Sequence, residues 1–372
     1  MLKGFYLTLL LGPVIPVPAP QPVIDALKGV QVTVSAGQRS GFQLSFGLSK
    51  SSLIQTALIP AGFFDPGIRV IIMVTVNSIP NVIMDGIITR QEVSQSNELG
   101  QSTLTVTGED VSVLMDLIEI PLPLPMPVEA RVALLIAKYA LFGLVPLVIP
   151  TIFPDIPIPI DRIPLQKGTD LSYINQLAKE NGYVFYIVPG PAPGMNLAYF
   201  GPEIRIGIPQ SALNVNMDQF TNVESLSFSF DGLSREQPVV LIQEPITKLT
   251  LPIPVPPLSL LSPPLAVRQA PSLKIKIVEN TAKLIPPLAL AKGLAQANQS
   301  ADAVSASGQL DVIRYGQPLS ARGLVGVRGA GLGYDGLYYV KSVTHNIKPG
   351  EYKQSFTLSR NGLVSITPTV PT

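Results

Sequence analysis

Alternation of hydrophobic and polar residues dominates the N-terminal part of the chain. Val30, Val32 and Val34 alternate with polar residues, and the same period returns over 42–48 after a turn-forming stretch at 37–41. A period of two is typical of strands with one buried face. Further strands are predicted at 68–77, 82–95 and 102–108. This part of the chain therefore indicates a compact antiparallel sheet or barrel.

Downstream of residue 110 the hydrophobic period changes to that of a helix. Pro127 suits a first helical turn, where its missing N–H would have no partner in any case. A second helix is predicted between a cap at Thr169 or Asp170 and Gly182, followed by a strand over 183–188. The apolar stripe of the first helix comprises Val128, Val132, Leu135, Ile136 and Tyr139, widened by Leu134 and Leu141.

The C-terminal part of the chain returns to a period of two. Short strands are predicted at 223–230 and 239–243, and a third helix starts at the proline pair 286–287. A meander closes the chain, with strands at 309–315, 324–328, 337–347 and 352–360. The elements thus form two β-rich blocks around a small α/β middle.

Two proline-rich apolar segments, 120–164 and 245–271, interrupt this pattern. Their prolines remove backbone donors, which argues against a free sheet and favours extended arms. The apolar residues between the prolines supply area that a partner could bury, and the alternative is a pair of loops packed on the chain's own sheets. The partner-docking candidates are Ile149, Ile152, Phe153, Ile156, Ile158, Leu251, Ile253, Val255, Leu258 and Leu260.

Composition narrows the class of protein. Only 14% of the residues are charged and 46% are hydrophobic, so partners are expected to cover part of the surface. No run of roughly 18 apolar residues lacks prolines or polar breaks, so no transmembrane helix is predicted. The apolar run at 5–11 after Lys3 stops at Gly12, which fits a first strand better than a signal peptide. A net charge of +1 gives no reason to bind nucleic acid.

Residue types that carry common catalytic chemistry are sparse. The chain has no cysteine and one histidine, His345, which cannot form a zinc site by itself. Common hydrolase motifs are missing from the sequence, so no catalytic residue, metal or cofactor is predicted. The glycine-rich stretch 323–336 fits tight turns better than phosphate binding, because a strand follows it. The carboxylates considered for a lysozyme-like pair are Glu92, Glu98, Glu109, Asp110, Asp116 and Glu119.

Three stretches carry a resemblance to a known family. They read TVTGEDVSVLMDL (105–117), KGTDLSYINQLAKENGYVFYI (167–187) and GLYYVKSVTHNIKPGEYKQSFTLSRNGL (336–363). In order and spacing they resemble the phage late control protein D family, which includes the hub part of VgrG spikes and the central hubs of contractile phage baseplates. The structural motif residues in these stretches are Gly108, Asp110, Thr169, Asp170, Leu171, Ile174, Leu177, Gly182, Phe185, Tyr339, Val343, Tyr352 and Phe356.

The resemblance implies an α+β, mainly β fold with two tube-like antiparallel β-barrel domains and a small α/β module. The expected domains are 1–115, 116–222 and 223–372, the last with the proline-rich insertion 245–271. Three copies would then present six similar barrels, matching a hexameric inner tube on one side and a trimeric spike on the other. Since no spike-like extension follows Gly362, we expect the spike to be a separate protein.

The function implied is a structural baseplate hub rather than an enzyme. Its expected partners are two further copies of the chain, the inner tube protein, the spike and the wedge or sheath-associated proteins. Assembly in the cytoplasm into a phage tail or injection particle is expected. The alternatives are a tail-associated cell-wall hydrolase and a surface-exposed β-rich adhesin.

Overall fold

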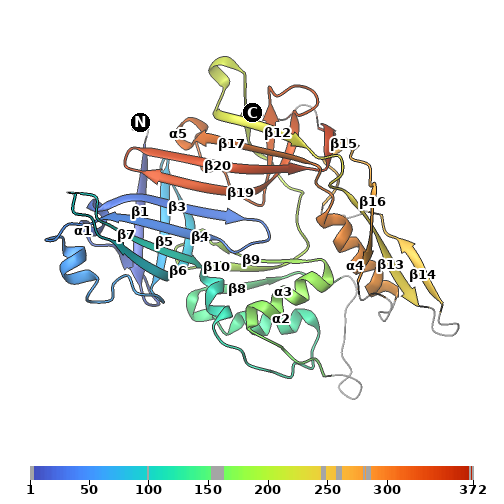
Figure 1. Cartoon of the computed structure of the whole chain (residues 1–372), viewed down its shortest axis with the longest axis horizontal. Coiled ribbons are helices and arrows are strands. Elements are labelled where there is room, and N and C mark those ends of the chain that lie inside the picture. Colours follow the sequence, from blue (N-terminus) through green and yellow to red (C-terminus); the bar gives the residue numbers. More distant parts are fainter. Residues whose placement is uncertain are drawn as a thin grey trace.

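The protein has a mainly β fold with large antiparallel sheets, as the sequence predicts. The computed structural model describes residues 4–98, 100–151, 163–243, 249–256, 262–279, 281, 286–367 and 370. A large sheet fills the upper and left parts of Figure 1, with helices α2 and α3 below it and a small separate sheet at the right-hand end.

The N-terminal half of the large sheet has the strand order β3-β4-β7-β6-β5-β1, and the two-residue strand β2 (Val17–Pro18) extends its edge. All neighbours in this half pair in the antiparallel sense. The strands predicted up to residue 108 are confirmed. Their bounds are β1 Phe5–Gly12, β3 Leu27–Ser35, β4 Gly41–Gly47, β5 Arg69–Val76, β6 Ile79–Ser94 and β7 Thr103–Asp110.

The C-terminal half of the same sheet has the order β12-β17-β20-β19-β18-β11. Its strands are β11 Gln210–Asn214, β12 Val223–Phe230, β17 Val304–Asp311, β18 Leu324–Arg328, β19 Gly336–Lys348 and β20 Glu351–Arg360. The predicted strand 309–315 is wrong at its end. Asp311 accepts hydrogen bonds from the N–H groups of Ile313 and Arg314 and so starts the short helix α5 (Val312–Tyr315).

The two halves join through β19 and β3. Residues 342–347 of β19 pair antiparallel with residues 30–35 of β3, so one 13-stranded sheet runs through both halves. A single hydrophobic core also spans both, from Leu9 and Phe46 to Tyr338 and Phe356. Among the described strands each half is an open sheet rather than a closed barrel.

The α/β module lies between the two halves in sequence. Its core joins Val132 and Ile136 of the first helix to Ile174 and Leu177 of the second, as the stripes predict. Leu134 and Leu141 were expected to widen the first stripe, but they are 45% and 83% exposed. Leu141 lies beyond the end of α2 at Ala137, so the helical period no longer applies to it. The elements are α2 Val128–Ala137, β8 Leu144–Val148, α3 Asp170–Asn181, β9 Val184–Pro189 and β10 Asn196–Gly201, with sheet order β8-β10-β9.

A small three-stranded sheet, β14-β13-β16, projects at the right-hand end of Figure 1 and packs against α4. The expectation that prolines keep this segment out of a sheet is wrong for β14. The N–H of Val255 donates to Pro238 of β13 (2.9 Å), so Pro252 and Pro254 face the free edge, where no donor is needed. The elements are β13 Glu236–Gln243, β14 Thr250–Pro254, β16 Lys274–Val278 and α4 Pro286–Gln299, with β15 Ala266–Gln269 paired to β21 Gly362–Ser365.

Several short helical turns were not predicted. They are α1 Gln21–Asp25, the π-helical turn Ile54–Leu58, and the 3-10 turns Val111–Asp116, Ala140–Phe142 and Asp218–Phe220. Within the described residues no helix is long and apolar enough to cross a membrane. The division at residues 115 and 222 stays a prediction. β11 precedes the second boundary but pairs with β18.

Candidate assembly surfaces

The first two family-like stretches meet where the large sheet joins the α/β module. Asp110, at the end of β7, accepts hydrogen bonds from the N–H groups of Ser40 (2.8 Å) and Ser112 (3.0 Å) and so starts the next helical turn. Burial raises the pKa of its carboxyl despite these bonds. Asp116 accepts a hydrogen bond from the Thr169 hydroxyl (2.6 Å). Asp110 and Thr169 thus fasten the module to the sheet.

The second stretch forms the core of the module. Thr169 caps α3 through the N–H of Ser172, and Gly182 ends it with a positive φ of 69°. The Asp170 carboxylate accepts hydrogen bonds from Lys138 Nζ (3.0 Å) and the Tyr139 hydroxyl (2.9 Å) of the first helix region. Leu171, Ile174 and Leu177 are buried, and Phe185 packs against the same cluster.

The third stretch forms β19 and β20. Its motif residues Tyr339, Val343, Tyr352 and Phe356 are all at most 2% exposed. His345 lies on β19, and its Nδ1 is 2.7 Å from the Tyr352 hydroxyl of β20. Burial lowers the pKa of His345 to about 4. The histidine is therefore a neutral core residue.

The glycine-rich stretch wraps around a buried arginine. The carbonyl of Gly333 accepts a hydrogen bond from Arg360 Nη2 (2.7 Å), and the carbonyl of Asp335 accepts one from Nη1 (2.8 Å). Arg360 is fully buried, and its guanidinium lies 4.4 Å from the centre of the Tyr338 ring. These carbonyls point at a cation of the protein itself, an arrangement opposite to the N–H groups that a phosphate would need.

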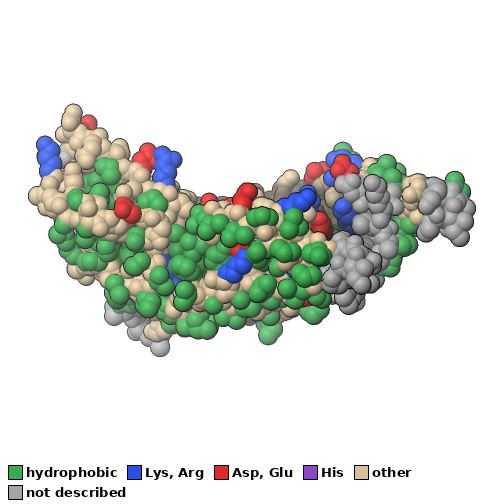
Figure 2. All heavy atoms as spheres, turned by 90° about the horizontal axis from the view of Figure 1, so that it is seen from below, with side chains coloured by type: hydrophobic (Ala, Val, Ile, Leu, Met, Phe, Trp, Pro, Cys, Tyr) green, Lys and Arg blue, Asp and Glu red, His purple; other side chains and the backbone are tan. Residues whose placement is uncertain are grey.

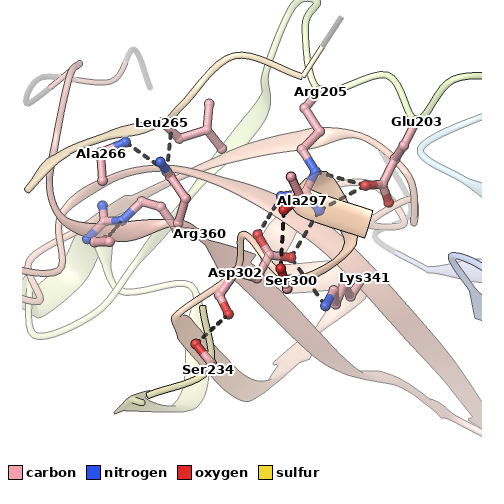
Figure 3. Close-up of polar contacts among 12 residues, drawn as sticks. Glu203, Arg205, Ser234, Leu265, Ala266, Ala297, Ser300, Asp302, Lys341 and Arg360 are labelled. Atoms are coloured by element: carbon pink, nitrogen blue, oxygen red, sulfur yellow. Dashed lines mark hydrogen bonds and ion pairs between the residues drawn. The ribbon is translucent and has the colours of Figure 1, made fainter. Parts of the chain in front are cut away.

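Sequence reasoning missed a buried charge network, drawn in Figure 3. Arg205 follows β10 and forms a two-pronged pair with Asp302, at 2.5 Å and 2.9 Å, while Glu203 binds its other side. Lys341 of β19 reaches Asp302 at 3.2 Å. Burial alone would raise the pKa of Asp302, but the Arg205 charge lowers it overall. Arg205 and Asp302 are 97 residues apart, so no local pattern could reveal the pair.

Four of the six acidic residues considered for hydrolysis make polar contacts, as described above for Asp110 and Asp116. Glu92 pairs with Arg90 on the surface (2.9 Å), and Glu109 pairs with Arg39 (2.9 Å). Across the described chain no group of three or more potential metal ligands comes together.

The partner-docking candidates have mixed surroundings. Leu251 and Ile253 of β14 are 54% and 36% exposed, whereas Val255 is buried beside Val240 and Val278. Ile149 lies just after β8, and its N–H donates to the carbonyl of Phe200 (2.8 Å). The other candidates lie outside the described residues; they are Ile152, Phe153, Ile156, Ile158, Leu258 and Leu260.

Exposed apolar side chains also follow the Val111–Asp116 turn and precede α3. Leu117 and Ile118 are 67% and 65% exposed. Ile163 and Leu165 are 53% and 47% exposed, and Leu165 forms an isolated β-bridge with Pro123. Figure 2 shows hydrophobic side chains spread over much of the lower face of the molecule and few charges on it. A surface of this kind marks an interaction site rather than a solvated face.

Two strand edges of the large sheet are also open. β12 pairs with β17 on one side, and residues 90–94 of β6 pair with β7 on one side; among the described strands neither has a second neighbour. Phe230 and Val93 on these strands are 39% and 41% exposed. Open edges of this length invite another strand.

Comparison with known proteins identifies the fold. No family model matches the sequence, and no curated protein matches it. A tail protein from Neisseria meningitidis has a TM-score of 0.64 at 14% identity, over 97% of this chain and 98% of that one. The 43 kDa tail protein of prophage MuSo2 from Shewanella oneidensis has a TM-score of 0.61 at 13% identity, over 96% and 99%. A chain of the Francisella PdpA–VgrG complex has a TM-score of 0.59 at 8% identity, over 99% and 60%.

The fold of this chain is therefore that of phage tail proteins and of a chain in a VgrG complex. The likeness covers nearly the whole of the chain. It agrees with the family resemblance expected from the three sequence stretches.

Proposed function

We propose that this protein is a structural component of a phage tail or a related contractile injection system, and within it the hub between the inner tube and the spike. The fold of tail proteins supports the general role. The observation that carries the specific role is the repetition of the large sheet. The order β3-β4-β7-β6-β5-β1 recurs as β12-β17-β20-β19-β18-β11 in the same chain order, and only the last pair differs, antiparallel for β1–β5 and parallel for β11–β18.

A repeated half gives one chain two similar building blocks. Three copies arranged around a threefold axis would present six such blocks in a ring, which suits contact with a hexameric tube. The same three copies present a threefold face, which suits a trimeric spike. A hub of this design joins two symmetries without any catalytic group.

The surfaces described above are proposed to serve this assembly. The exposed Leu117 and Ile118 would contact tube, wedge or sheath-associated proteins. The proline-rich segments would act as docking arms, with Leu251 and Ile253 as their exposed contacts. A variant with Leu251→Ser and Ile253→Ser that still forms trimers but no longer enters particles would support this role. Unchanged particle yield would reject it. We propose assembly in the cytoplasm, without a cofactor and without nucleic acid.

Mass photometry of the purified protein tests the hub proposal. We expect a trimer, and averaged electron micrographs should show a ring with threefold symmetry and six similar lobes. A protein that remains monomeric even with its spike present contradicts the proposal. Zymograms on peptidoglycan should stay blank, and clearing that is lost on Glu92→Gln or Glu109→Gln substitution would favour a cell-wall hydrolase instead.

A further inference from the structure

Five strands of each half of the large sheet repeat each other down to single hydrogen bonds, whereas the sixth strands, β1 and β11, pair in opposite senses. The N–H of Gly67 donates to Ile88 of β6 (2.8 Å), and the N–H of Ile88 donates to Ile68 (2.8 Å). In the second half, the N–H of Arg322 donates to Val340 of β19 (2.8 Å), and the N–H of Val340 donates to Gly323 (2.9 Å). Gly67 and Arg322 also share a positive φ, 97° and 66°. Ile88 and Val340 are therefore equivalent positions.

Register shifts at matching places fix the equivalence residue by residue. The pairing of β6 with β7 shifts between Ile88 and Arg90, and that of β19 with β20 shifts between Val340 and Ser342. The pairing of β3 with β4 shifts between residues 27 and 29, and that of β12 with β17 shifts between residues 223 and 225. Arg90 therefore corresponds to Ser342. Residues 227–231 correspond to residues 31–35.

The β19–β3 junction within one chain shows how the two open edges could pair between copies. Residues 342–346 of β19 pair with residues 35–31 of β3. Their equivalents are residues 90–94 of β6 and residues 231–227, the end of β12 with the adjoining Asp231; these are the two open edges described above. Figure 1 shows these edges on opposite sides of the sheet, with β12 at the top and β6 at the bottom. A contact between two different edges of identical chains is the kind that closes a ring.

We propose that residues 90–94 of β6 pair antiparallel in a second copy with residues 231–227, the end of β12 and the adjoining Asp231, in the register of the β19–β3 junction. This rests on the proposed hub function and specifies which surfaces of the copies meet. Arg90 then lies opposite Asp231 of the second copy, Glu92 opposite Ser229, and Ser94 opposite Ser227.

The side chains fit this register on the polar face. At the junction within the chain, the hydroxyls of Thr33 and Thr344 lie 3.1 Å apart, and Gln31 donates to Asn346 (3.2 Å). The equivalent pairs between copies join a cation to an anion, a carboxylate to a hydroxyl, and a hydroxyl to a hydroxyl. Each is a favourable cross-strand pair, and a shift by two residues would place Arg90 opposite Ser229 instead.

The apolar face fits as well. At the junction within the chain, Val32 and Val343 are fully buried and His345 is 5% exposed. Their equivalents are Phe228, Gln91 and Val93, so two of the three positions stay apolar, and Gln91 is a polar exception that donates to Asp65. Val93 is 41% exposed. Pairing the two edges would place Val93 opposite Phe228 of the second copy and bury it.

Two other exposed strand edges carry residues that hinder pairing, whereas the edge of β12 does not. β14 has Pro252 and Pro254 on its free edge, and β16 carries Lys274 and Lys276. Prolines and lysines at edges prevent the addition of further strands. Residues 225–230 of β12 include no proline and no charge, and residues 90–94 of β6 include no proline but carry Arg90 and Glu92, of which Arg90 would meet Asp231. An unprotected edge is expected where a strand is meant to bind.

Cysteine cross-linking tests the register directly, because the chain has no cysteine of its own. The double variant Glu92→Cys with Ser229→Cys places both thiols at one proposed cross-strand pair, where the Cβ atoms would lie about 4.5–5.5 Å apart. After mild oxidation, a denaturing gel without reductant should show covalently linked dimers and trimers. Mass photometry before oxidation reports the association itself, and the native chain is measured beside the variant.

Two controls frame the result. Glu92→Cys with Ser225→Cys shifts one thiol by four residues, roughly 13 Å along the strand, and should give no linked species. Thr33→Cys with Thr344→Cys, at the junction within the chain, should form a disulfide without raising the mass. Trimers that fail to link at 92 and 229, or that link equally at 92 and 225, overturn the register and leave the hub proposal standing. A native chain that does not associate overturns both.

Discussion

His345 gives the folded core a defined response to acid. The side chain is 5% exposed on β19, and burial lowers its pKa from 6.5 to about 4. Between these two values the unfolded chain binds a proton at His345 that the folded chain does not. Because protons then favour the unfolded state, the stability supplied by the neutral histidine is complete above pH 6.5 and is lost as the pH falls toward 4.

The size of this effect follows from the two pKa values. The difference between 6.5 and about 4 corresponds to about 3 kcal/mol of unfolding free energy. This is a large fraction of the roughly 5–15 kcal/mol by which most domains are stable. The loss should begin near pH 6.5, above the range in which exposed carboxylates titrate.

Urea unfolding of the native protein and of His345→Gln at pH 7, 5.5 and 4 isolates the effect. Glutamine can accept the hydrogen bond of the Tyr352 hydroxyl but does not titrate in this range. Both proteins are compared at one protein concentration, because association shifts apparent stability. The native protein should lose about 3 kcal/mol more than the variant between pH 7 and pH 4. Equal losses would refute the assignment of His345 as a buried neutral group.

Three further outcomes are expected from single substitutions. Leu177→Asp puts a charge at a buried position of the module core and should cost several kcal/mol and abolish soluble expression, whereas Leu134→Asp, at a position 45% exposed, should express normally. Asp302→Ala leaves Arg205 buried without its main partner and should lower unfolding free energy by about 3–5 kcal/mol in urea titrations, against less than about 1 kcal/mol for the exposed pair in Glu92→Ala. Gly108→Ala should lower the melting temperature by several degrees, because a Cβ there would lie 2.3 Å from the Ile87 carbonyl oxygen, whereas Gly4→Ala meets nothing within 4 Å.

Local patterns in the sequence determined most elements of the fold. The period of two located β3, β4, β19 and β20, because one face of each strand packs on the core. The cap at Thr169 and the glycine at 182 located α3, since helix ends need specific side chains or a positive φ. The lack of charge correctly indicated a surface with large apolar areas.

Two predictions from local sequence are wrong because the same residues are compatible with another structure. The prolines of β14 predict a segment outside any sheet, yet at a free edge a missing N–H is harmless. The apolar run ending in Tyr315 was read as a strand, but the Asp311 side chain caps a helical turn there. The first outcome depends on which side of the backbone faces a neighbour, and the second on which N–H groups the Asp311 carboxylate reaches.

Only the tertiary structure revealed the repeated halves and the buried charge network. Leu44 and Gly308, or Val32 and Phe228, occupy equivalent places in the two halves although the residues differ, because strand pairing uses the backbone and tolerates many side chains. Arg205 and Asp302 come together across 97 residues through the fold of intervening elements. The sequence by itself specified the faces of single strands and helices. Which edges meet, and which remain open for another copy, was decided by how the whole sheet is arranged.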